Sequence, residues 1–168
     1  MRMVDIQVLR RVNRRYYRPG DRVLRQPTPA EVADLLTELC TPDDDPRWWN
    51  HPVIGHVGAM DGVEFIVAPE TGYVALYWTG TAERSLNPQP FADAPLLPDS
   101  GDNDPLMYWP RSAYISSSDA KKALAEHIVT GAQPTNVQWQ PWGWEVRQLP
   151  RWLKPEMPEY SGFHLIED

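Results

Sequence analysis

The side chains that could perform acid–base chemistry are scattered along this sequence rather than grouped into a motif. The four histidines, His51, His56, His127 and His164, lack the i, i+4 spacing that places two metal ligands on one helix face. A hydrolase that used His51 or His56 with distant carboxylates would need the fold to bring these side chains together, and their spacing in the sequence gives no sign of this. Gly-x-Gly-x-x-Gly, the phosphate-binding P-loop and Gly-x-Ser-x-Gly are absent. We therefore predict that the protein is not an enzyme.

Metal binding is restricted by the cysteine count and by the arrangement of the carboxylates. The single cysteine, Cys40, excludes an intramolecular disulfide, a multi-cysteine zinc site and the zinc-deaminase signature His-x-Glu with Pro-Cys-x-x-Cys. The acidic runs at 43–45 and 99–104 offer oxygen ligands suited to Ca²⁺ or Mg²⁺, but they lack the ligand spacing of an EF-hand. We interpret 43–45 as a solvated loop and 99–104 as either a partner-facing acidic loop or an exposed turn. No cofactor or metal is predicted.

Charge is distributed unevenly along the chain. Residues 1–26 contain eight arginines against Asp5 and Asp21, a net charge of +6. Because the net charge of the whole chain is −7, residues 27–168 carry −13. An acidic body of this kind repels nucleic acid and attracts basic protein surfaces. Arginines flanking a strand are more often an aggregation-resistant edge than a nucleic-acid contact. We therefore expect a protein partner with a basic surface, and no nucleic-acid binding.

Length and composition indicate one folded domain covering residues 1–168. An apolar content of 42% supports a hydrophobic core, while 18 prolines imply short elements and many loops. No apolar run approaches the roughly 20 residues that span a bilayer. The N-terminal residues lack the apolar region of a secretory signal. These features predict a cytoplasmic protein that does not enter the membrane.

Two segments carry clear helix signals. In "TPAEVADLLTELC", Thr28 and Glu31 form a capping box. In the second segment, Ser116 and Asp119 approximate the same box, and Gly131 suits a left-handed helix end. The apolar stripes at helical spacing are Val32, Leu35, Leu36 and Leu39, and then Ala120, Ala123, Leu124, His127 and Ile128. We interpret His127 as a helix-end histidine facing the last-turn carbonyls rather than as a base or a ligand.

Alternating apolar segments predict a sheet that is mostly antiparallel. The predicted strands lie at 4–9, 22–24, 52–58, 63–68, 72–78, 105–109, 112–116, 136–140 and 142–149. Turn-rich connections at 59–62 and 69–72 suit hairpins. In 72–78 both faces are apolar, which is typical of a central strand. The predicted fold class is α+β, with two main helices packed on the sheet, a basic strand segment at 1–26 and an irregular tail at 145–168.

Acidic and aromatic residues in irregular segments are the candidates for partner binding. Residues 79–104, rich in proline and acidic residues, predict a long surface excursion, and ordered loops of that length tend to be functional. Tryptophans in polar loops are typical of protein interfaces and of sugar-binding sites, with core packing as the alternative. For Trp78 and Trp139, on strands, core packing is our interpretation. The predicted binding residues are Trp48, Trp49, Glu83, Asp93, Asp99, Asp102, Asp104 and Trp109.

The segment "ISSSDAKKALAEHIVTGAQPTNVQWQ" resembles a family signature. The matching residues are Ala120, Ala123, Leu124, Gly131, Pro134, Val137 and Trp139, while His127 stands where an aromatic residue is usual. "TPAEVADLLTEL" and "GYVALYW" match as well. The resemblance is to the first-numbered Imm family, the immunity proteins of bacterial polymorphic toxin systems. It covers most of residues 28–140, and residues 1–26 and the tail beyond Trp144 have no clear counterpart.

The resemblance implies a function that agrees with the charge distribution. Members of the family are small cytoplasmic α+β proteins that bind and neutralise a cognate secreted toxin, often a nucleic-acid deaminase. By this resemblance the chain is an immunity protein whose acidic and aromatic side chains occlude the active site of a deaminase-like toxin. The alternative is a carbohydrate- or ligand-binding module that uses exposed tryptophans.

Overall fold

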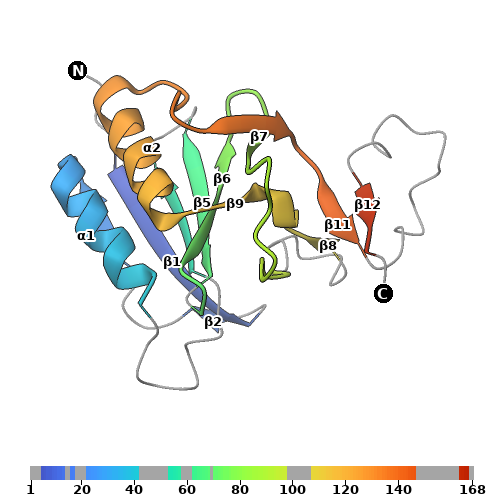
Figure 1. Ribbon diagram of the computed structural model, residues 1–168. Helices are drawn as coiled ribbons and strands as arrows, with labels where there is room; N and C mark the ends of the chain where they lie inside the picture. Colours follow the sequence, from blue (N-terminus) through green and yellow to red (C-terminus); the bar gives the residue numbers. More distant parts are fainter. Residues whose placement is uncertain are drawn as a thin grey trace.

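The fold is seen in a computed structural model that describes residues 5–13, 16–17, 22–41, 53–57, 62–68, 70–97, 107–146 and 163–166. Within these ranges, two helices pack on one face of a large sheet, and a smaller sheet lies on the other side of the molecule (Figure 1). The predicted α+β fold with a mostly antiparallel sheet and two main helices is confirmed.

The large sheet has nine strands, and every described pairing in it is antiparallel. Its order is β10 (Gln138–Pro141), β7 (Glu83–Leu86), β6 (Tyr73–Trp78), β5 (Val63–Ala68), β4 (Val53–Val57) and β1 (Asp5–Asn13), with β2 (Tyr16–Tyr17) and β3 (Arg22–Arg25) on β1 and β9 (Tyr114–Ile115) on β6. The strands predicted at 4–9, 22–24, 52–58, 63–68, 72–78, 112–116 and 136–140 are therefore present. β6 lies at the centre, with β5 on one side and β7 and β9 sharing the other.

The two helices begin and end where the sequence predicts. In α1 (Pro29–Leu39) the side chain of Thr28 accepts from the Glu31 N–H, and the Glu31 carboxylate accepts from the Thr28 N–H, completing the capping box. α2 (Ser117–Thr130) is capped by Ser116 and ends at Gly131, whose φ of 69° is the left-handed conformation that glycine adopts without strain. Neither described helix combines the length and apolarity needed to cross a bilayer.

Side chains on the two faces of β6 enter two separate cores. Val74, Leu76 and Trp78 face the helices, where they pack with the buried stripes of α1 and α2. Ala75 on the opposite face belongs to a second cluster; its buried members are Ile66, Ala75, Trp109, Ala113 and Tyr114, with Tyr73, Tyr77, Phe91, Ala94 and Leu97 packed against them. The predicted central position of this strand is confirmed. Trp139, like Trp78, packs on the helix-side core as expected.

The smaller sheet is built from segments that are distant in the sequence. It contains β8 (Met107–Tyr108), β11 (Trp144–Val146) and β12 (Phe163–Leu165), and β12 runs parallel to β11. A short 3₁₀ helix, η1 (Arg111–Ala113), connects β8 to β9. The tail predicted to be irregular thus contributes a strand, because pairing with β11 satisfies its backbone groups.

The predicted surface excursion at 79–104 is partly wrong. Residues 83–86 form β7, a strand inside the sheet, with Arg84 and Ser85 fully buried. Residues 87–97 follow as coil that packs Phe91, Ala94 and Leu97 on the second core. Three of the four residues in the strand "ERSL" are polar, and they broke the apolar alternation on which the prediction relied.

Candidate functional site

Three of the eight predicted binding residues lie in the part of the chain that the structure describes. These are Glu83, Asp93 and Trp109. The other five, Trp48, Trp49, Asp99, Asp102 and Asp104, lie outside the described residues, as do the acidic runs at 43–45 and 99–104.

Trp109 supports the core beneath the second face of the sheet. It is 5% exposed, and the guanidinium carbon of Arg84 lies 3.9 Å from its ring centroid. Tyr77 lies near the same guanidinium, at 5.6 Å. Arg84 Nε donates to the backbone oxygen of Gly143 at 3.0 Å. A buried arginine is therefore enclosed by aromatic rings and tied to the chain between β10 and β11.

Ser85 lies beside the position in β6 at which its pairing changes from β9 to β7. β9 pairs with β6 at Val74 and Ala75, whereas β7 pairs with it at Tyr77 and Trp78. Between them, Ser85 Oγ accepts from the Leu76 N–H at 2.9 Å and donates to the Ala113 oxygen at 2.5 Å. The serine therefore joins β6, β7 and η1 with one side chain.

Glu83 presents an ionised carboxylate at the first residue of β7, between β10 and β6. Its side chain accepts from the Thr81 hydroxyl and from Gln133 Nε2, the latter at 3.0 Å. Accepting these bonds, the Thr81 bond above all, lowers the pKa of Glu83. The carboxylate is thereby fixed in one position.

Glu126, on α2, holds the connection from that helix to β10. Its carboxylate accepts from the Thr135 hydroxyl at 2.8 Å and from the Thr135 N–H at 3.1 Å. These bonds, led by the hydroxyl, lower the pKa of Glu126. Sequence reasoning missed this residue, since its partner lies nine residues away beyond a glycine and a proline.

Replacing Glu126 with glutamine is expected to reduce the loss of stability in acid. Because the folded-state pKa lies below the ordinary value, the carboxylate stabilises the fold above that value, and the contribution disappears as pH falls through the folded pKa. The free energy of unfolding, measured by urea titration from about pH 6 to pH 3, should fall less for Glu126→Gln than for the natural protein. Thr135→Val should give an intermediate slope, because it keeps the backbone donor. Identical slopes for all three proteins would contradict this role of Glu126.

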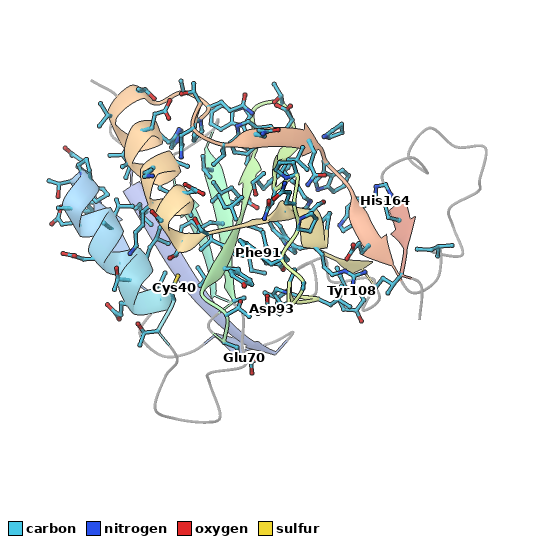
Figure 2. All side chains as sticks on the ribbon, in the orientation of Figure 1. Cys40, Glu70, Phe91, Asp93, Tyr108 and His164 are labelled. Atoms are coloured by element: carbon cyan, nitrogen blue, oxygen red, sulfur yellow. The ribbon has the colours of Figure 1, made fainter. Side chains whose placement is uncertain are left out.

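Asp93 belongs to a half-buried aromatic cluster on the side of the sheet away from the helices. The Tyr73 hydroxyl donates to Asp93 Oδ1 at 2.8 Å, and the Tyr73 ring stacks on Phe91 with centroids 4.0 Å apart. Figure 2 shows Phe91 and Asp93 on the coil that follows β7. The bond to Asp93 raises the pKa of Tyr73. The exposed carboxylate of Asp93 is thus held against two aromatic rings.

A groove of about 420 Å³ opens beside this cluster. Its walls come from three segments: the coil after β7, the N-terminal turn of α2, and the approach to β10. The lining residues are Leu86, Asn87, Pro88, Gln89, Phe91, Ile115, Ser116, Asp119, Asn136, Val137 and Gln138. Phe91 is common to the groove and to the Tyr73 stack.

A protein-family model matches residues 20–141, which include both helices, the groove, Glu83 and Asp93. Its description is Immunity protein Imm1. The chain belongs to the Imm1 family. Searches of curated proteins and of solved structures found no match. Imm1 proteins neutralise toxins and are not enzymes, so the partner of this chain is a cognate toxin.

The two described acidic residues predicted for this Imm1 protein do not share one patch. Glu83 lies opposite Trp78 at one end of β6, whereas Asp93 is bonded to Tyr73 at the other end. The five intervening residue steps of an extended strand separate these ends by about 17 Å. Glu83 also pairs with Trp78, which faces the helices, whereas Asp93 lies on the opposite face, so an Imm1 surface that used both carboxylates would have to reach both faces of the sheet.

Trp142 is the exposed tryptophan in the described part of this Imm1 protein. It is 41% exposed, while Trp78, Trp109 and Trp144 are each less than 10% exposed. The Trp142 ring contacts that of Trp144, and the backbone N–H of Trp142 donates to the backbone oxygen of Ala82. Among the described tryptophans no other ring is exposed to this extent, so the described residues do not group the exposed tryptophans on which the carbohydrate-binding alternative depends.

The two described side chains of this Imm1 protein that could act as a base or a nucleophile, His127 and Cys40, have structural roles instead. His127 is 1% exposed; its Nδ1 lies 2.7 Å from the Ala132 oxygen, and its ring meets Trp78 edge to face. The histidine lies at the helix end as predicted, but the carbonyl that it contacts belongs to Ala132, beyond the C-cap Gly131, and not to the last turn of α2. Burial raises the pKa of Cys40, which disfavours the reactive thiolate. Among the described residues, no group of His, Cys, Asp or Glu gathers to hold a metal.

Proposed function

We propose that this Imm1 protein neutralises a nucleic-acid-modifying, deaminase-like toxin in the cytoplasm by covering its substrate cleft. A protein that acts on nucleic acid needs a basic cleft to hold the phosphate backbone. The chain beyond residue 26 carries a net charge of −13 beside the +6 of residues 1–26. An acidic inhibitor competes for the surface that the toxin uses for its substrate.

The observation that carries the proposal is the immobilisation of carboxylates around the sheet. Glu83, Asp93 and Glu126 each accept hydrogen bonds that fix the side chain before a partner arrives. Binding then costs little side-chain entropy. Each carboxylate keeps lone pairs for further donors, since an ionised carboxylate can accept about four hydrogen bonds. Arginine and lysine side chains of a basic cleft are suitable donors.

The predicted residues outside the described ranges are part of the same proposal as further toxin contacts. Asp99, Asp102 and Asp104 add acidic charge, and Trp48 and Trp49 would supply aromatic anchors. Trp109, which is buried, enters the proposal as support for Arg84 rather than as a contact.

Co-expression with the toxin whose gene we expect beside this one tests the proposal. Cells producing the toxin should grow only when the immunity protein is present, and the two proteins should elute together on gel filtration. The purified complex should block deamination of single-stranded DNA or RNA by the toxin. Growth arrest despite co-expression, with no co-elution, would reject the proposal. A toxin that is neutralised but lacks activity on nucleic acid would reject the deaminase-like target alone.

Association of the two proteins is expected to slow with added salt. Electrostatic steering raises association rate constants to about 10⁸ M⁻¹s⁻¹ at low salt, against roughly 10⁵–10⁶ for neutral surfaces. Between low and high ionic strength the association rate constant should therefore fall about 10- to 100-fold, while the dissociation rate constant changes little. Stopped-flow or biosensor measurements provide both constants. A salt-independent association rate would show that the acidic surface does not guide the encounter.

A further inference from the structure

We propose that the groove lined by residues 86–89, 91, 115, 116, 119 and 136–138 receives an arginine side chain of the toxin. This inference rests on the proposed function and adds the place and chemistry of one contact. At about 420 Å³ the groove is far larger than the roughly 10–15 Å³ that a single water molecule needs, so it has room for a long side chain.

Charge favours a cationic occupant over an anionic one. Asp119 is the one charged residue among the described residues that line the groove. Its carboxylate accepts from the Ser116 hydroxyl at 3.0 Å and lies at the N-terminal turn of α2, where it offsets the positive end of the helix dipole. Lys122 approaches Asp119 at 3.9 Å, but its side chain is 67% exposed and does not line the groove. An ion pair as exposed as this one contributes little energy, so a guanidinium bound in the groove can replace Lys122 as the partner of Asp119.

The polar lining is oriented to accept hydrogen bonds. Asn136 Nδ2 donates to the backbone oxygen of Asp119 at 3.1 Å, which leaves the Oδ1 of the same amide as an acceptor. Asn87 uses its amide within the protein, donating to the Tyr114 oxygen and accepting from the Gln89 N–H. Asp119 and Asn136 therefore stand ready for an external donor. A guanidinium group has five N–H donors and no acceptor.

The apolar lining suits the rest of an arginine side chain. Ile115 and Val137 lie on the wall shared with the helix-side core and can cover the methylene stem. Phe91 presents an aromatic ring that is held in place by its stack on Tyr73. A guanidinium stacks on such rings more readily than an ammonium does, which favours arginine over lysine.

A matched pair of charge substitutions tests the contact. Gln138→Arg places a cation in the groove at an exposed lining residue, whereas Val129→Arg adds the same charge at the far end of α2, where the side chain is 73% exposed. The affinity for the toxin encoded beside this gene should fall at least 30-fold for Gln138→Arg and less than about 3-fold for Val129→Arg. Asp119→Asn should weaken binding about 10-fold. Equal affinities for the natural protein, Gln138→Arg and Asp119→Asn would overturn the inference and leave the proposed function intact.

A second measurement examines the groove without the toxin. N-acetyl-arginine amide, titrated at millimolar concentration, should shift the amide NMR signals of Phe91, Asp119 and Gln138. The citrulline analogue, which has the same shape without the charge, should shift them much less. If the natural protein fails to bind the toxin, the proposed function is rejected, and this titration alone then shows whether the groove binds a guanidinium group. Absent shifts, or equal shifts with citrulline, would overturn the cation site.

Discussion

Replacing Arg84 with alanine is expected to lower the free energy of unfolding by about 3–5 kcal/mol. The buried guanidinium lies 3.9 Å from the ring centroid of Trp109, and a desolvated cation–π contact contributes about 2 kcal/mol. The bond from Nε to the Gly143 oxygen is charge-assisted and contributes about 1.5–3 kcal/mol. Alanine would also leave a void between Tyr77 and Trp109. Losses of this size approach the whole stability of a small domain.

Urea unfolding with two further variants separates these contributions. Arg111→Ala is the control, since Arg111 is 45% exposed and its ion pair with Glu145 should contribute less than about 1 kcal/mol. Arg84→Met keeps most of the volume but loses the charge and the hydrogen bond, so its effect should be about half that of Arg84→Ala. A change below about 1 kcal/mol for Arg84→Ala would contradict a stabilising role for the buried arginine.

The Arg84 contact also bears on the surface that a partner meets. Gly143, which accepts the bond, separates the exposed Trp142 from the buried Trp144. Loss of the bond frees the chain between β10 and β11, and β10 begins at the groove residue Gln138. Toxin affinity should therefore fall for Arg84→Ala even at temperatures where the variant stays folded.

The parts of the fold that sequence predicts are those governed by local rules. The capping box of Thr28 and Glu31 and the left-handed Gly131 fix helix ends through contacts within one turn. The strands at 63–68 and 72–78 were predictable because both of their faces are apolar and a short connection joins them. The family resemblance rested on the same local units, and the family match covers them.

The parts that sequence missed depend on contacts between distant segments. Arg84 and its acceptor Gly143 are separated by 59 residues, so "ERSL" contains no local sign that its arginine is buried. The groove is assembled from three segments lying between residues 86 and 138, none of which is concave alone. Asp93 was predicted from its charge alone, whereas its hydrogen bond from Tyr73, whose ring stacks on Phe91, depends on how the coil after β7 packs on the sheet. No spacing rule reports such proximity.

Replacing Ser85 with alanine removes only one hydroxyl group, yet it is expected to destabilise the protein by about 2–4 kcal/mol. Without Oγ, the Leu76 N–H and the Ala113 oxygen lose the hydrogen bonds that Ser85 gives them inside the protein, and each unsatisfied buried group costs about 1–3 kcal/mol. The midpoint of thermal unfolding should fall by about 10 °C for a chain of this size. Ser118→Ala, on the exposed part of α2, is the control and should change stability by less than about 0.5 kcal/mol.

The position of Ser85 gives this substitution a consequence for binding. β7 continues into the groove wall formed by residues 86–89 and 91, and β9 continues into the wall formed by Ile115, Ser116 and Asp119. Ser85 ties β7 to η1, immediately before β9, so its hydroxyl helps set the spacing of the two walls. If the groove receives an arginine of the toxin, Ser85→Ala should raise the toxin dissociation constant several-fold under conditions where the fold is intact. Ser118→Ala should leave it unchanged. A loss of stability without any loss of affinity would mean that toxin binding does not depend on the spacing of these walls.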